Sequence, residues 1–127
     1  MKNITEILLL IFLAITFIQS GLDKIMDWSG NLGWLKGHFS KTLFKNIVPL
    51  LLGIILFLEC LSGVSAVAGA VQFAAFDSNS LSCYAAILSC ITLLFLLLGQ
   101  RIAKDYDGAR TIVVYFIPAV FLLFLLQ

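Results

Sequence analysis

The stretch SLSCYAAILSCITLLFLLLG, residues 80–99, decides the class of fold because it contains no charged side chain. A helix rises about 1.5 Å per residue, so about 20 residues span about 30 Å, the thickness of the hydrocarbon core of a bilayer. Transmembrane β-strands are about ten residues long and alternate polar with apolar side chains, a pattern that this stretch lacks. The stretch therefore predicts a membrane-spanning helix.

Three further segments, residues 4–22, 47–71 and 111–126, are apolar enough to cross a membrane as helices. The whole chain is 61% hydrophobic and 12% charged, whereas about a quarter of the residues of a soluble domain are charged. No repeat or linker divides the sequence. We therefore predict an all-α membrane protein, with a single domain over residues 1–127 that forms a bundle of four transmembrane helices.

The first connection, residues 23–46, is too long for a simple turn. It mixes Trp28 and Trp34 with lysines and glycines, and both Trp and Lys favour the headgroup zone of a membrane. We expect a short amphipathic or re-entrant segment along the membrane surface. It serves either as a plain interfacial anchor or as a lid over a site between the helices.

The distribution of basic residues predicts the orientation of the chain. The loops 23–46 and 100–110 share one side of a four-span protein, and Lys2 is the one basic residue on the other side. Cytoplasmic loops of membrane proteins carry an excess of Lys and Arg. We therefore expect both loops in the cytoplasm and both termini outside. The basic residues of the two loops are Lys24, Lys36, Lys41, Lys45, Arg101, Lys104 and Arg110.

Several classes of function are disfavoured by what the sequence lacks. The net charge of +1 gives no basic field that would attract nucleic acid. The three cysteines form no Cys-x-x-Cys pair, and there are no paired histidines for haem and no nucleotide-binding fingerprint. We expect the single histidine, His38, to be solvated at the membrane surface. No cofactor is evident from the chain itself.

Glu59 lies near the middle of the second span, where an ionised carboxylate costs roughly 2.5–3.5 kcal/mol. We expect it to face the bundle interior, in its neutral form unless a cation or a hydrogen-bond donor lies close. Ser62, Ala66 and Ala70 share its helix face and let another helix approach closely.

Other polar side chains occur at similar depths on the remaining spans, and on the first span they form a continuous stripe. We predict a polar pocket between the helices beneath the first loop, with Glu59 at its floor. The alternative is that these groups only hydrogen-bond neighbouring helices, at about 0.6 kcal/mol each. The pocket candidates are Glu59, Gln19, Ser20, Thr16, Ser89 and Tyr115.

The charged residues at the ends of the spans have two possible roles. Asp23 or Asp27 can form a salt bridge with Arg101 or Arg110, which would tie the helix ends together. Alternatively, the same groups bind an anionic or quinone headgroup at the membrane surface.

Three short motifs resemble the DoxX family of small four-helix bacterial membrane proteins. They are FIQSGLDK at 17–24, Glu59 followed by Gly63, and IAKDYDGA at 102–109. The resemblance implies a location in the bacterial inner membrane. The family is named after a subunit of a thiosulfate:quinone oxidoreductase, and its relatives include proteins connected with redox chemistry and protein maturation. The positions that it marks, or that lie at the cytoplasmic junctions, are Ser20, Gly21, Asp23, Lys24, Glu59, Arg101, Lys104 and Asp105.

Two functions follow as expectations. The first is an accessory or assembly subunit without catalytic activity of its own, which docks a membrane-protein partner or a second copy and whose pocket holds a lipid or a quinone. The second is a quinone-interacting component of a membrane oxidoreductase, in which Glu59 handles protons and Tyr115 or Gln19 orients the ring. A small transporter is a weaker third expectation, since four helices leave little room for alternating access.

Overall fold

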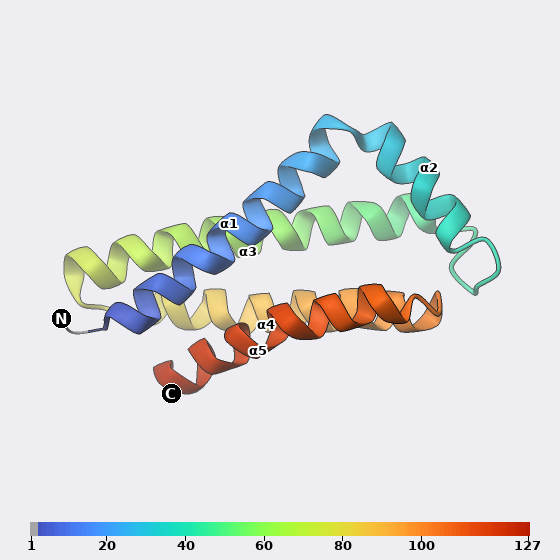
Figure 1. Ribbon diagram of the computed structural model, residues 1–127. Coiled ribbons are helices and arrows are strands. Elements are labelled where there is room, and N and C mark those ends of the chain that lie inside the picture. Colours follow the sequence, from blue (N-terminus) through green and yellow to red (C-terminus); the bar gives the residue numbers. More distant parts are fainter. Residues whose placement is uncertain (1–2) are drawn as a thin grey trace.

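The computed structural model describes residues 3–127, and helices make up nearly all of that part (Figure 1). Four of the five helices there are long and apolar enough to cross a membrane, namely α1, α3, α4 and α5. The predicted all-α bundle of four spans is therefore confirmed. Lys2, which entered the prediction of orientation, lies outside the described residues. The helices are α1 (Ile4–Met26), α2 (Trp28–His38), α3 (Val48–Phe76), α4 (Ser80–Ile102) and α5 (Tyr106–Leu126).

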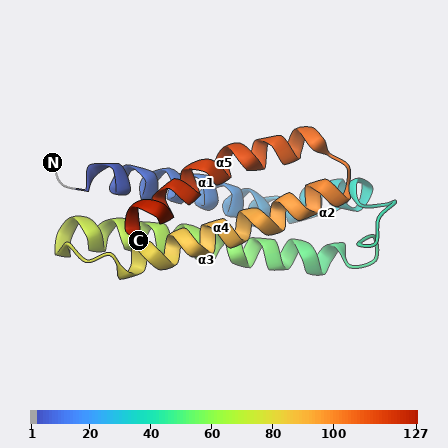
Figure 2. The ribbon, with the colours of Figure 1, turned by 90° about the horizontal axis from the view of Figure 1, so that it is seen from below.

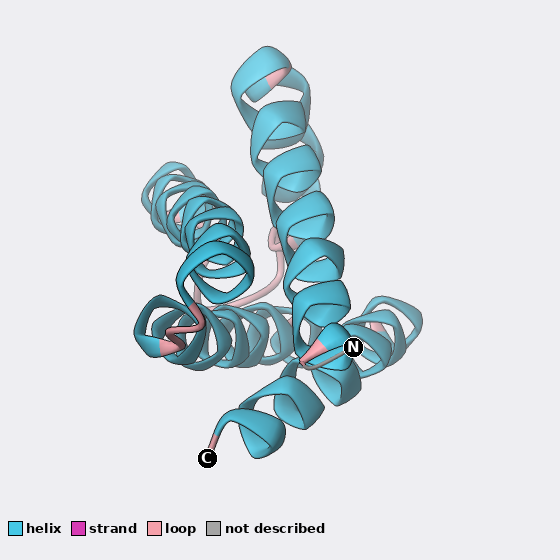
Figure 3. Cartoon of the chain, turned by 90° about the vertical axis from the view of Figure 1, so that its left-hand side faces the viewer, coloured by secondary structure: helices cyan, strands magenta, loops and turns pink. Residues whose placement is uncertain are grey.

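The four long helices pack in the order α1, α3, α4, α5 around the bundle. The fourth side, between α1 and α5, is packed much less closely, and Figure 1 shows these two helices separating toward the end that carries α2. Figure 2 shows α2 and the α4–α5 turn at the same end of the bundle. The start of α1, the C-terminus and the α3–α4 turn lie at the opposite end, which faces the viewer in Figure 3.

Side chains cap the starts of α2 and α5, two boundaries that the sequence did not predict. Asp27 ends α1 and caps α2, where its carboxylate accepts a hydrogen bond from the Gly30 N–H at 3.3 Å. Asp105 caps α5 in the same way, with the Gly108 N–H at 3.0 Å. A carboxylate at this position satisfies one of the free N–H groups of a first helical turn. The link between α4 and α5 therefore shrinks from the expected residues 100–110 to residues 103–105.

Glycines set the close approach of neighbouring helices. A Cβ added to Gly63 on α3 would lie 3.1 Å from the backbone N of Ile18 on α1, and one added to Gly69 would lie 3.0 Å from the Cα of Ser82 on α4. Small residues let membrane helices pack backbone to backbone. Ser82 uses this proximity, since its hydroxyl donates to the Gly69 carbonyl at 3.1 Å.

The interior is mainly apolar, but it includes a buried hydroxyl pair between α3 and α4. Thr92 Oγ1 donates to the Leu88 carbonyl at 2.8 Å, so its single proton is used. The 3.1 Å contact between Ser62 and Thr92 then has Ser62 as the donor. Large apolar side chains such as Phe57, Val64 and Val114 point outward and are exposed, as expected of a surface that faces lipid.

Candidate functional site

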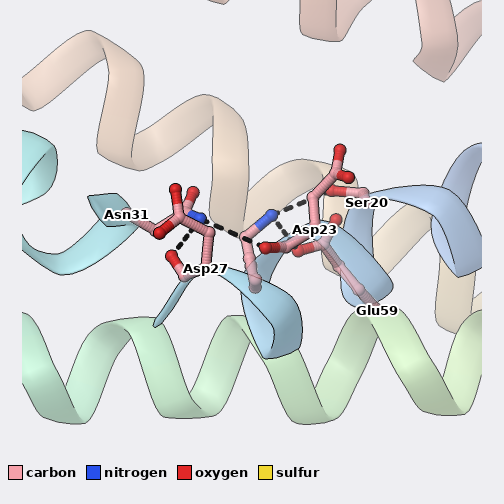
Figure 4. A network of polar contacts seen from close by, with 6 residues as sticks. Ser20, Asp23, Asp27, Asn31 and Glu59 are labelled. Carbon is pink, nitrogen blue, oxygen red and sulfur yellow. Dashed lines mark hydrogen bonds and ion pairs between the residues drawn. The ribbon is translucent and has the colours of Figure 1, made fainter. Parts of the chain in front are cut away.

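A buried ion pair joins α1 to α3. Lys24 Nζ lies 2.7 Å from Glu59 Oε1 and also donates to Ser20 Oγ at 2.8 Å (Figure 4). The side chain of Glu59 is 3% exposed and that of Lys24 is 17% exposed. The sequence left the charge of Glu59 dependent on a nearby cation, and the structure places Lys24 in that position.

The packing of α1 on α3 explains why these two side chains meet. Gly21 lies one turn before Lys24 and fits against Cys60, where an added Cβ would be 3.0 Å from Sγ. Gly63 lies one turn after Glu59 and fits against Ile18. Both glycines bring the backbones together on the same side of the pair, deeper in the bundle, and the lysine stem reaches back to the carboxylate from less than one turn away.

Glu59 also lines a cleft of about 380 Å³ between α1 and α5. The cleft lies on the loosely packed side of the bundle, so it opens laterally toward the space that lipid occupies. Leu93 and Leu96 of α4 contribute apolar wall. Its remaining lining consists of Ile15, Thr16, Phe17, Gln19, Ser20, Asp23, Ile112 and Tyr115.

Five of the six pocket candidates, all but Ser89, therefore lie together in this cleft, and Asp23 joins them. Ser89 is fully buried one turn deeper along α4 than Leu93, and its hydroxyl has no hydrogen-bond partner within residues 3–127. Sequence spacing placed it on the correct helix face, but the cleft ends before its depth. Whether the five residues bind a ligand stays a prediction.

The polar groups of the cleft differ in what they offer to a ligand. Thr16 Oγ1 donates to the Phe12 carbonyl at 2.8 Å, so it has lone pairs to offer but no proton. Within residues 3–127, the Gln19 amide and the Tyr115 hydroxyl make no hydrogen bond, and each can donate as well as accept. The Tyr115 ring packs beside Phe12, with ring centroids 6.3 Å apart.

The other junction residues take structural roles outside the cleft. The Arg101 guanidinium lies 4.9 Å from the centre of the Tyr106 ring, and Lys104 has a left-handed backbone with φ of 61° in the α4–α5 turn. Asp105 caps α5. The alternative of a salt bridge from Asp23 or Asp27 to Arg101 or Arg110 is not realised, because Arg110 pairs with Asp107 at 3.7 Å and Asp27 caps α2.

His38 is a structural residue that sequence reasoning missed. Its Nε2 lies 2.9 Å from Gln100 Oε1 and 3.8 Å from Asp105 Oδ2, and its ring stacks on Trp34 at 4.5 Å. The expectation of a solvated histidine was therefore wrong. Nothing in the local sequence signals a contact between the end of α2 and the end of α4. The contact fastens α2 across the end of the bundle.

The helix α2 supplies none of the side chains that line the cleft, so in this conformation it is no lid over the cleft. In residues 3–127 no three His, Cys, Asp or Glu side chains converge into a group that could hold a metal ion. Comparison of the chain with protein-family models, with curated proteins and with solved structures found no match.

Proposed function

We propose that this multi-pass membrane protein is an accessory or assembly subunit of a membrane complex, and that its cleft holds the polar end of a lipid or a quinone. The resemblance of its motifs to the DoxX family points to the bacterial inner membrane. The observation that carries the proposal is that Glu59, which is paired with Lys24, lines a cleft on the loosely packed side of the bundle. Ionisable groups at membrane depth are expensive and rare, and they often mark ligand or ion sites.

The shape of the cleft supports a ligand that arrives through the bilayer. Its mouth lies between α1 and α5, where Ile15 is largely exposed. A molecule in the membrane can leave its apolar tail among lipid chains while its polar end meets Gln19, Asp23 and Tyr115. Pockets with an apolar lining and a few convergent polar groups are the usual form of a small-molecule site.

A variant that fills the cleft tests this proposal. Gln19→Trp adds a large side chain at the exposed rim of the cleft, so we expect the purified protein to retain less co-purified lipid or added quinone analogue in native mass spectra. Val114→Trp adds the same bulk on the lipid-facing surface of α5, outside the cleft lining, and should leave retention unchanged. Equal retention by both variants and the wild type would show that the cleft is not the site.

The second candidate function, a quinone-interacting oxidoreductase component, has one observation in its favour. Tyr115 and Gln19 offer unused donors on the same cleft that Glu59 lines, and quinone carbonyls accept such hydrogen bonds. Glu59→Gln keeps the shape of the side chain and removes its titrating proton. Loss of quinone-linked activity with binding retained would favour this function, whereas unchanged activity would exclude proton handling by Glu59.

The accessory role predicts a lasting complex with a membrane protein or with a second copy of the chain. The measurement is extraction of native membranes in a mild detergent, with the tagged chain at its natural level, followed by determination of the mass of the complex. A species larger than one chain plus its detergent is expected. Repeated recovery of a single chain alone would overturn the role.

A further inference from the structure

We infer that the ligand of the cleft carries an ammonium head group, which is bound by Asp23 at the cleft mouth, and an apolar tail that lies in a groove between α1 and α3. This inference rests on the proposed function, because it names the chemical class of the molecule that the cleft holds. Two observations support it. Asp23 has no counter-charge among the described residues, and it borders both the polar cleft and the apolar groove.

Two carboxylates, those of Asp23 and Glu59, line the cleft, and no Lys or Arg side chain of the described residues does. The ammonium of Lys24 lies outside the lining and is engaged by Glu59 at 2.7 Å and by Ser20 at 2.8 Å. Within residues 3–127, the Asp23 carboxylate forms no salt bridge and no side-chain hydrogen bond. The Asp23 carboxylate, which is exposed at the mouth of the cleft, is therefore the charge of the lining that has no counter-charge on the described part of the protein. It favours a cationic head group and repels a phosphate that has no cation of its own.

Asp23 also lies at the depth where a lipid head group would be found. It is roughly 28 Å along α1 from Ile4, at about 1.5 Å per residue, which is close to the thickness of the hydrocarbon core. Gln19 and Thr16 follow it inward, and both present oxygen acceptors. An ammonium has three donors and no acceptor, so these groups complement it.

The groove for the tail lies along the other flank of α1. It has a volume of about 820 Å³, and the residues Ile15, Gln19 and Asp23 border both this groove and the cleft. Apart from Gln19 and Asp23 its lining is entirely apolar, and Asp23 is the one charged residue in it. The remaining lining residues are Ile7, Ile11, Ala14, Ile18, Leu22, Met26, Val67, Ala70, Val71 and Ala74.

A long apolar groove with a single carboxylate near one end matches an amphiphile with one cationic group. Two sources share this chemistry, an aminophospholipid such as phosphatidylethanolamine and a single-chain alkylamine. Both have a primary ammonium that Asp23 can bind and an apolar tail that the groove can cover. An anionic lipid with the same tails, such as phosphatidylglycerol, lacks the ammonium and brings only negative charge to the same place.

The test is competition for the full-length protein in a neutral detergent, read by native mass spectrometry. The probes are phosphatidylethanolamine against phosphatidylglycerol with identical acyl chains, and dodecylamine against dodecanol. We expect the wild type to retain the ammonium member of at least one pair about tenfold better, which corresponds to about 1.4 kcal/mol. The pair that shows the preference identifies the source as the phospholipid or the single-chain amine.

Two matched variants locate the head group. Asp23→Asn should reduce the preference to less than about twofold, a loss of most of that tenfold discrimination. Asp27→Asn removes the same charge about one turn further along, borders neither hollow and keeps a good helix cap, so it should retain the preference. No preference in the wild type, or an unchanged preference in Asp23→Asn, overturns the inference.

The cleft-filling variant separates this inference from the proposed function. If Gln19→Trp lowers retention of all four probes but the wild type does not distinguish their head groups, the cleft binds amphiphiles and only the ammonium assignment fails. If Gln19→Trp changes the retention of no probe, both the ammonium assignment and the proposed function fail.

Discussion

Lys24 lies near the end of a membrane helix, where a lysine ordinarily extends its ammonium outward to the headgroups. In this protein the side chain turns inward and contacts Glu59 and Ser20. Each charge lowers the free-energy cost of burying the other, because the attraction between them offsets part of the cost of removing both from water. The position of one side chain thus accounts for the presence of a charged residue in the second span.

The ion pair should contribute measurably to stability. We expect Glu59→Gln and Lys24→Met each to lower the free energy of unfolding by roughly 1–3 kcal/mol, because each leaves a buried polar group without its charged partner. The double variant should lose less than the sum of the two. The measurement is a double-mutant cycle by reversible unfolding in mixed micelles, with Lys36→Met on exposed α2 surface as the control. Strict additivity would mean that the two residues do not interact.

A glycine pair on α3 tests the close approach of the helices. In Gly63→Ala the new Cβ would lie 2.6 Å from Ile18 Cγ1 and 3.1 Å from the Ile18 backbone N, so α1 must move. We expect a loss of roughly 1–3 kcal/mol in the same unfolding assay. Gly53→Ala has no atom within 4 Å of the new Cβ and should be neutral or slightly stabilising. Equal effects of the two changes would exclude backbone contact as the reason for Gly63.

At the scale of helices, α2 is the element whose role the structure changed most. None of its residues is fully buried, so it does not belong to the core. Asp27 caps its start, and His38 near its end contacts Gln100 of α4. Phe39, directly after α2, is buried and lies against the His38 ring. Both ends of α2 are thus held in place, while the side chains between them stay at least partly exposed.

The His38 contact predicts how α2 responds to mutation. His38→Ala removes the hydrogen bond to Gln100 and the stacking on Trp34, so we expect faster amide hydrogen exchange over residues 28–47 with little change in the four spans. The control is Lys36→Ala, on the exposed surface of the same helix. Exchange that rises equally in both variants, or in neither, would show that His38 does not hold α2 in place.

The two ends of the bundle differ in charge and in the position of the cleft. Seven of the eight basic residues belong to the segments at the α2 end, and the cleft with its ion pair opens in the half of the bundle nearest to them. The other end holds the start of α1, the C-terminus and the short α3–α4 turn (Figure 1). Because positive loops are retained in the cytoplasm, the cleft is expected on the cytoplasmic side of the membrane.

This orientation can be measured in intact cells. The native cysteines are first replaced, and a single cysteine is then introduced at Lys36 on α2 or at Ser78 in the α3–α4 turn. We expect a membrane-impermeant maleimide added from outside to label the Ser78 position and to leave the Lys36 position unmodified until the cells are opened. The reverse pattern would place the α2 end, and the cleft with it, outside.

Much of this architecture was predictable because hydrocarbon imposes a local requirement. A span must satisfy its backbone hydrogen bonds within itself and present apolar side chains along about 20 residues, so length and composition identify it. Glu59 was equally visible, since a carboxylate in such a span stands out. The helix boundaries were less accurate. The helices α1, α3 and α4 run three to five residues past their predicted ends, and the cap at Asp105 starts α5 five residues earlier than predicted, among polar residues that are typical of a loop.

The sequence by itself determined the number of spans, their order and the polar stripe along the first of them, because each depends on neighbours within one helix. Only the tertiary structure decided that Lys24 meets Glu59, that His38 meets Gln100 and that Ser89 lies beyond the cleft. Those outcomes depend on how helices rotate and cross. The helices α1 and α3 cross where Gly21 and Gly63 let the two backbones approach closely. This steric fit joins segments that are distant in sequence, so no local pattern encodes it.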